Sequence, residues 1–271
     1  MTAHRAAGSL ACVGLGMTLG SHLTPLARST IEQADVVFVA ASDALVEQWV
    51  ARLNTEVRSL QTRYRDGVSR MQTYHDMVAT ILAEVRRGRQ VCAAFYGHPG
   101  VFCWPAHEAL RQAREEGYAA RMEPGISAAD CLYADLGIDP GLRGCQHLEA
   151  TQLLLYRRAI DVGGWVVLWQ AGVVGDIELI QDVGDAACRQ LLCEVLAAHY
   201  PPGHPVIVYR AATLPVGGAT VRRVRLQDLA AVELAVEDTL VLAPGGELAP
   251  NLAIRSRLEA LTRAHTRVVR R

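Results

Sequence analysis

The sequence has almost no excess of either charge, with 27 basic against 28 acidic residues among 271 and a formal net charge of −1. Binding to nucleic acid needs a basic surface, so this balance argues against a nucleic-acid partner. Long hydrophobic runs are also absent. The stretch from Trp165 to Trp169 is far shorter than the ~20 residues that span a bilayer, so no membrane association is expected.

The usual motifs of metal and nucleophilic sites are missing as well. The seven cysteines are odd in number and form no Cys-x-x-Cys pair, which argues against a disulfide framework and a zinc site. The histidines are scattered without metal-ligand spacing, and neither a Gly-x-Ser-x-Gly elbow nor a phosphate-binding Gly-Lys-Ser sequence occurs. We therefore expect a reduced, cytoplasmic protein with no metal.

The content of 51% hydrophobic residues is enough for a sizeable core. Apolar runs alternate with helical patterns, which predicts an α/β fold with a parallel sheet in the first half. Tight glycine turns in the second half favour antiparallel pairing there. The predicted strands are 9–13, 36–39, 91–95, 166–169, 206–209, 220–226 and 239–242, and the predicted helices are 25–34, 42–53, 69–87, 105–116, 127–137, 185–199 and 252–264.

The chain is expected to form two α/β lobes, residues 1–123 and 124–271, with a ligand cleft between them. The buried run that ends at Phe95 leads into a turn rich in glycine and proline, Tyr96 to Phe102. Ligand sites of α/β proteins lie at such strand ends. Gly100 is expected to leave space for the ligand. The earlier glycine loop 14–20 misses the dinucleotide spacing by one residue and is weak evidence by itself.

Tyr64, Arg70 and Tyr74 precede this turn in the sequence. Arg70 and Tyr74 are four residues apart, so on a helix they share one face and can reach one reaction centre. Such a pair is more often an ordinary surface pair, and the spacing alone does not assign a function.

Together, the turn 96–102, the Tyr64, Arg70, Tyr74 spacing and the segment Pro124 to Pro140 resemble the tetrapyrrole methylase superfamily, and within it the borosin peptide backbone N-methyltransferases. The resemblance implies a two-lobed fold with S-adenosylmethionine (SAM) in the cleft between the lobes and S-adenosylhomocysteine as product. By position, the cofactor contacts fall on Tyr96, His98, Val101, Phe102, Ser127, Ala128, Gln170, Ala211 and Thr239. Capping of a helix or strand is the simpler interpretation of Gln170 and Thr239.

The same resemblance assigns the catalytic positions to Tyr64, Arg70, Tyr74 and Tyr96. An amide nitrogen is a poor nucleophile because its lone pair is delocalised. Methylation requires loss of the proton and stabilisation of charge on the carbonyl oxygen, which suits a permanently charged arginine with phenolic donors. Tyr74 is the leading candidate for the base. Some relatives have a further tyrosine three positions before Tyr64, where this chain has Gln61.

Two other functions remain open from the sequence. A methyltransferase of a small molecule such as a corrinoid is opposed by His98, where corrin-modifying relatives carry aspartate, and by the missing acid of the first glycine loop. A catalytically silent SAM-binding or peptide-binding module is opposed by the Tyr64, Arg70, Tyr74 set.

The resemblance also implies partners. Fused borosin enzymes continue into a clasp and an apolar core peptide, whereas residues 263–271 are rich in arginine. The expected substrate is therefore a separate precursor peptide that is methylated in trans. A homodimer is expected, extended by the precursor to a heterotetramer.

Overall fold

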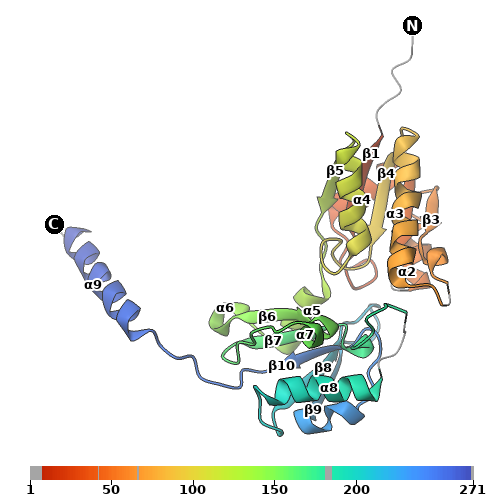
Figure 1. Cartoon of the computed structure of the whole chain (residues 1–271). Helices are drawn as coiled ribbons and strands as arrows, with labels where there is room; N and C mark the ends of the chain where they lie inside the picture. The colour runs from red at the N-terminus through yellow and green to blue at the C-terminus, as the bar shows by residue number, and fades with distance from the viewer. Residues whose placement is uncertain (1–7, 42, 66, 181–184, 270–271) are drawn as a thin grey trace.

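The computed structural model describes residues 8–41, 43–65, 67–180 and 185–269, which form two five-stranded sheets (Figure 1). The N-terminal sheet is entirely parallel. In spatial order its strands are β3 (Val57–Ser59), β2 (Val36–Ala40), β4 (Gln90–Phe95), β1 (Ser9–Gly14) and β5 (Ala119–Glu123). The carboxyl ends of these strands all lie at one edge, where α/β proteins place their ligands.

Helices cover both faces of the N-terminal sheet. They are α1 (Pro25–Gln33), α2 (Ala44–Val50), α3 (Arg70–Arg86) and α4 (Trp104–Glu115). Alternate residues of β1 enter different cores: Leu10 and Cys12 pack with α3 and α4, whereas Ala11 and Val13 pack with α1 and α2. A strand buried on both sides must be apolar throughout, which explains the uninterrupted apolar runs of β1, β2 and β4.

The C-terminal sheet is mixed. Its order is β6 (Cys145–Glu149), β7 (Trp165–Trp169), β10 (Thr239–Leu242), β8 (Pro205–Arg210) and β9 (Thr220–Arg225). Only the β6–β7 pair is parallel. Packed around this sheet are α5 (Ala128–Leu136), α7 (Ala150–Leu155), α8 (Ala186–Ala197) and the 3₁₀ turns η2 (Ala171–Val173) and η3 (Leu226–Ala231). The short helix α6 (Pro140–Arg143) lies between α5 and β6 in the chain and has no buried residue. A third 3₁₀ turn, η1 (Gln61–Arg63), precedes α3.

The α/β prediction is confirmed, as are all seven predicted strands and the helices that correspond to α1, α3, α4, α5 and α8. The helix predicted at 42–53 is shorter, and Ser42 lies outside the described residues. Three strands were missed, β3, β5 and β6. β3 has three residues, and β5 and β6 carry charged or polar side chains on exposed positions, so none gives an apolar run. The short helices α6 and α7 were missed as well.

The last helix, α9 (Leu252–Val269), stands apart from both sheets in Figure 1 and is longer than predicted. Ile254, Leu258 and Leu261 follow the spacing of one helical face and are exposed. Among the described residues, no helix combines the length and apolarity needed to cross a bilayer. All seven cysteines are free thiols.

Three glycines allow the strand ends of the N-terminal sheet to meet. Gly14 ends β1, Gly97 follows β4 and Gly125 follows β5. A Cβ on Gly125 would lie 2.3 Å from the Gly97 carbonyl oxygen and 2.8 Å from the Gly14 Cα. Both neighbours are backbone atoms, which cannot move aside as a side chain can. The absence of a side chain at Gly125 therefore sets how closely these segments pack.

We expect Gly125→Ala to destabilise the fold by about 1–3 kcal/mol, the usual cost of overpacking, because the methyl group would push apart the ends of β1 and β4. Urea denaturation measures the change in the free energy of unfolding. Gly203→Ala is the matched control, since a Cβ there would meet nothing within 4 Å. Equal midpoints for the two variants would contradict this packing constraint.

Candidate active site

The turn after β4 lies against the first glycine loop. Gly97 N–H donates to the Gly16 carbonyl at 2.9 Å, and Gly16 N–H donates to the Gly97 carbonyl at 3.1 Å. The same loop reaches the C-terminal half, where the Thr18 hydroxyl donates to the Ala212 carbonyl at 3.0 Å and Leu19 N–H donates to the Thr213 carbonyl at 3.0 Å. The glycine loop thus joins the turn 96–102 to the segment that follows β8.

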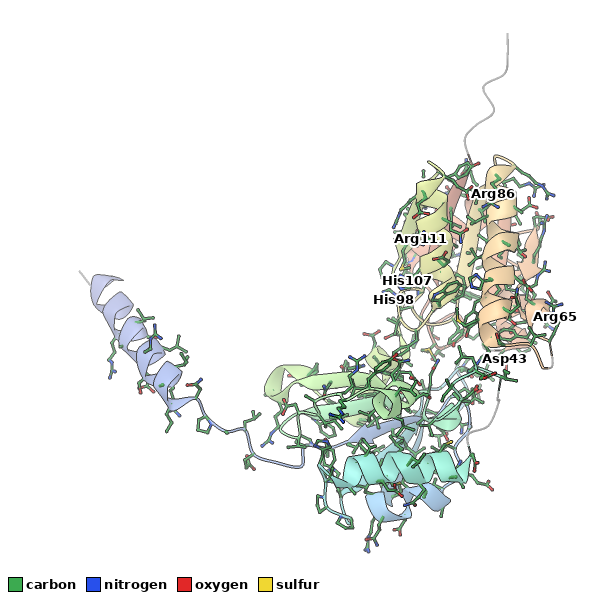
Figure 2. All side chains as sticks on the ribbon, viewed as in Figure 1. Asp43, Arg65, Arg86, His98, His107 and Arg111 are labelled. Atoms are coloured by element: carbon green, nitrogen blue, oxygen red, sulfur yellow. The ribbon has the colours of Figure 1, made fainter. Side chains whose placement is uncertain are left out.

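His98 folds back over this turn. Its Nδ1 accepts a hydrogen bond from Gly100 N–H at 2.8 Å, and the Gly100 carbonyl lies 3.0 Å from Nε2 of His107 on α4. Figure 2 shows the two histidines together at the end of α4 that faces the C-terminal sheet, away from Arg86 at the other end of the helices. The imidazole of His98 is therefore fixed by the backbone of its own turn.

Gly100 was expected to leave space for a ligand, and the structure shows which side chains a Cβ at this position would meet. A Cβ there would lie 2.9 Å from Cε1 of His98 and 3.0 Å from Sδ of Met122. Glycine at this position makes room for the His98 ring and Met122. The expectation that it also leaves space for a ligand stays a prediction.

Two of the predicted cofactor residues have strained backbones. Phe102 has φ of 50° and Gln170 has φ of 56°, and Leu179 is the third non-glycine residue with positive φ among those described. Such conformations cost of order 1–3 kcal/mol and persist where the surroundings impose them, often at ligand sites. Gln170 precedes η2 but makes no side-chain capping bond, so the simpler explanation of this residue fails.

Phe102 is linked to the C-terminal sheet through a line of aromatic rings. Its ring lies 5.7 Å from that of Trp169, the residue before Gln170. Trp169 Nε1–H donates to Nδ1 of His147 at 3.0 Å, and His147 Nε2 lies 2.6 Å from the Tyr133 hydroxyl. Because Nδ1 accepts a hydrogen bond, His147 is neutral with its proton on Nε2. Burial also lowers the pKa of His147 and favours this form.

The remaining predicted cofactor residues lie nearby. Ala128, at the start of α5, and Ala211, just after β8, belong to the same apolar cluster as Trp169. Thr239 begins β10 opposite Tyr209 of β8 and is buried. Ser127 caps α5: its N–H and hydroxyl both donate to Asp130 at 2.7 Å, so its hydroxyl is committed to the helix. The sequence-predicted set is brought together around one edge of each sheet.

The structure also gathers the four predicted catalytic side chains. The phenols of Tyr64 and Tyr74 are close enough to change each other's pKa, and the charge of Arg70 acts on Tyr64, Tyr74 and Tyr96. Arg70 is the first residue of α3, which Ser69 caps by accepting from Gln72 N–H at 3.3 Å. Tyr74 lies one turn later and stacks on Trp104 of α4, with 6.4 Å between ring centroids.

All three phenols are weaker acids than an ordinary tyrosine. Burial raises the pKa of Tyr64, of Tyr74 and of Tyr96, the last to about 12. Arg70 lowers the pKa of each of them, and at Tyr74 it is the largest effect after burial. The interaction between Tyr64 and Tyr74 lowers the pKa of Tyr74 and raises the pKa of Tyr64. Tyr74 is therefore the phenol best placed to lose a proton.

One residue that contacts this set could not be predicted from the sequence. Asp176, in the loop after η2, is 3% exposed, and its Oδ2 lies 3.0 Å from Nη2 of Arg70. The two residues are separated by 106 positions, and no local pattern around Asp176 marks it. Only the packing of the C-terminal half against α3 reveals the pair.

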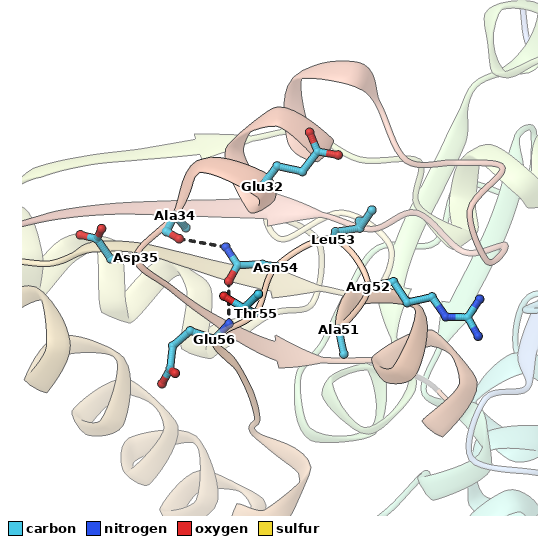
Figure 3. Close-up of a pocket in the computed structure, with 9 residues that line it drawn as sticks. All are labelled: Glu32, Ala34, Asp35, Ala51, Arg52, Leu53, Asn54, Thr55 and Glu56. Carbon is cyan, nitrogen blue, oxygen red and sulfur yellow. Dashed lines mark hydrogen bonds between the residues drawn. The ribbon is translucent and has the colours of Figure 1, made fainter.

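A separate hollow of about 300 Å³ lies at the amino ends of β2 and β3, at the opposite end of the strands from the turn 96–102 (Figure 3). Asn54 spans it, donating to the Ala34 carbonyl at 2.9 Å and accepting from Glu56 N–H at 2.8 Å. The hollow therefore lies away from the tyrosines. In the described part of the chain, no group of His, Cys, Asp and Glu has the arrangement of a metal site.

Comparison with known proteins agrees with this geometry. Residues 9–230 match the model of the family described as tetrapyrrole (corrin/porphyrin) methylases. Two solved structures share the fold. Uroporphyrin-III C-methyltransferase from Thermus thermophilus has a TM-score of 0.63 and 23% identity, and the match covers 88% of this chain and 93% of that one. Cobalt precorrin-4 methyltransferase has a TM-score of 0.61 and 18% identity, and the match covers 87% of this chain and 94% of that one.

Curated relatives are more similar in sequence. One is named a methyltransferase and ribosomally synthesized type I borosin cyclic peptide precursor, from Coprinopsis marcescibilis, and is 38% identical over 98% of this chain and 70% of its own length. Another, the methyltransferase and omphalotin A precursor of Omphalotus olearius, is 38% identical over 94% of this chain and 62% of its own length. This chain thus spans about two thirds of each relative.

Proposed function

The chain belongs to the tetrapyrrole (corrin/porphyrin) methylase family and groups there with the borosin methyltransferases, and from this premise we propose that it transfers methyl groups from SAM to backbone amide nitrogens of a ribosomally made peptide. The observation that carries the proposal is the cluster of Tyr64, Arg70 and Tyr74 beside Tyr96. One permanent cation surrounded by three phenols suits an amide, whose oxygen must be stabilised while its nitrogen loses a proton.

The residues around the turn suit SAM. Val101 and Phe102 expose apolar surface there, and Tyr96 is half exposed beside them, which favours an adenine ring and a sulfonium cation. The strained Phe102 and Gln170 come from the two halves of the chain, so we propose that the cofactor lies between lobes 1–123 and 124–271. The proposed contacts are Tyr96, His98, Val101, Phe102, Ser127, Ala128, Gln170, Ala211 and Thr239.

SAM, when bound, supplies an electrophilic methyl group. In the proposed reaction, Arg70 donates hydrogen bonds to the carbonyl oxygen of the peptide amide and stabilises the negative charge that develops there. Tyr74, as phenolate, accepts the amide proton. Tyr64 donates to the Tyr74 oxygen, and Tyr96 orients the amide from the turn. The attacking nitrogen then carries the electron pair that the planar amide had delocalised.

We further propose that the substrate is a separate precursor peptide and that none of these 271 residues is methylated. The support is composition: the last helix carries arginines between its apolar residues and has no continuous apolar segment resembling a core peptide. The proposed assembly is a homodimer, extended by precursor chains to a heterotetramer. Its support is the exposed apolar face of α9, which a second copy would cover.

The test of the function is transfer of labelled methyl groups from SAM to candidate peptides. We expect backbone N-methylation, located by tandem mass spectrometry, and a loss on the order of a hundredfold or more in Arg70→Ala and in Tyr74→Phe, typical of removing an oxyanion donor or a base. Calorimetry should show SAM affinity unchanged in both. Tyr118→Phe, outside the cluster, is the control. Label only in side chains, or wild-type rates in both variants, would overturn the proposal.

The raised phenol pKa values predict an alkaline dependence. Burial keeps Tyr74 protonated near neutrality, while Arg70 acts in the opposite direction and Cys103 adds to the increase. The active phenolate therefore grows as pH rises, and kcat/KM should increase about tenfold per unit between roughly pH 7 and 9. Initial rates in matched buffers measure this slope. A flat profile in that range would show that no phenol of raised pKa serves as the base.

The dimer has its own test. Replacing Ile254 and Leu258 by Asp should weaken self-association, because each substitution places a charge on the face proposed to be covered. Light scattering across a concentration series measures the mass. Arg257→Asp, on the same helix, controls for a change of charge alone. A monomeric wild-type protein, or equal masses for all forms, would refute the dimer without bearing on the chemistry.

A further inference from the structure

Arg70 is held by the C-terminal half through both its backbone and its side chain. Its N–H donates to the Leu179 carbonyl at 2.8 Å, and its Nη2 donates to Oδ2 of Asp176 at 3.0 Å. The side chain of Arg70 is 18% exposed and that of Asp176 3%. The pair joins the first turn of α3 to the loop after η2, across the two halves of the molecule.

Asp176 also shapes the loop that holds Arg70. Its Oδ1 accepts from Ile180 N–H at 3.1 Å, which closes the segment 176–180 on itself. Within that segment Leu179 has φ of 57°, a costly conformation for a branched residue. In this conformation the Leu179 carbonyl meets the N–H of Arg70. One carboxylate thus fixes the guanidinium directly and the backbone beneath it indirectly.

The guanidinium keeps a donor for a ligand. Nε of Arg70 is buried and has no hydrogen-bond partner among the described residues. A buried N–H without an acceptor is costly, and a substrate oxygen would satisfy it. Since a guanidinium is planar, fixing Nη2 on Asp176 also sets the direction in which its other N–H groups point.

We propose that Asp176 is a positioning residue for methyl transfer, holding the Arg70 guanidinium in the orientation that binds the peptide oxygen. This inference rests on the proposed function. A misplacement of about 1 Å at a reacting group can cost on the order of a hundredfold in rate, so the aspartate acts on kcat although it touches neither peptide nor cofactor.

Asp176→Asn tests this role with little change in volume. The amide retains one oxygen acceptor, so it can hold Arg70 or Ile180 but not both as the carboxylate does. We expect kcat to fall about ten- to a hundredfold, with SAM affinity by calorimetry unchanged. Asp176→Glu keeps the charge but shifts it by a methylene group; it should also lower kcat, and it carries the test if the Asn variant does not fold.

The matched control is Glu84→Gln, at the opposite end of α3. Glu84 is also 3% exposed and pairs with arginines, Arg58 among them at 3.0 Å. This variant should lower the melting temperature yet leave kcat within twofold of wild type. It thereby separates the loss of any buried carboxylate from the loss of the one beside Arg70.

A double-mutant cycle separates positioning from general support of the fold. If Asp176 acts through Arg70, adding Asp176→Asn to Arg70→Ala should not reduce the rate further. A further drop in the double variant, a wild-type kcat in Asp176→Asn, or a parallel loss of SAM affinity would overturn the inference. Failure of the wild-type protein to methylate any peptide would instead refute the proposed function, so the two outcomes are distinct.

Discussion

The candidate site at the carboxyl ends of the N-terminal strands depends on the close approach of three backbone segments, which meet at glycines. β1, β4 and β5 end at Gly14, Phe95 and Glu123, and the glycines at 14, 97 and 125 pack backbone against backbone. Parallel strands bring their carboxyl ends to one edge, but only glycine lets the following turns touch there. The turn 96–102 is consequently fixed on a rigid base, and its strained Phe102 can be directed toward the C-terminal sheet.

The sequence was sufficient for those parts of the fold that depend on long apolar runs. β1, β4 and β7 are buried along nearly their whole length, and their composition shows it. β5 and β6 were not foreseen because the sheet pairs them through backbone hydrogen bonds that do not depend on their polar side chains. Propensity and periodicity describe side chains, so strands formed at a sheet edge by backbone pairing give little signal.

In the candidate site, too, some residues could be predicted from the sequence and others could not. The Arg70 and Tyr74 spacing and the turn after β4 could be found because each is local, and the family resemblance joined them. The supporting residues could not be found. Asp176 pairs with a side chain 106 positions away, and His147 reaches Phe102 only through Trp169. Contacts of this kind are created by the packing of one half of the chain on the other, which no short window of sequence contains.

The pairing of Arg70 with Asp176 also resolves a conflict in the electrostatics. An arginine beside three phenols would help one of them ionise, yet a largely buried cation without a partner is costly. The carboxylate of Asp176 offsets that cost, and in doing so it weakens the field of Arg70 at the phenols. The raised pKa of Tyr74 is consistent with this balance, because burial there prevails over the charge of Arg70. Burial therefore holds Tyr74 protonated, and in the proposed reaction the positive charge of SAM would act together with Arg70 to favour the phenolate.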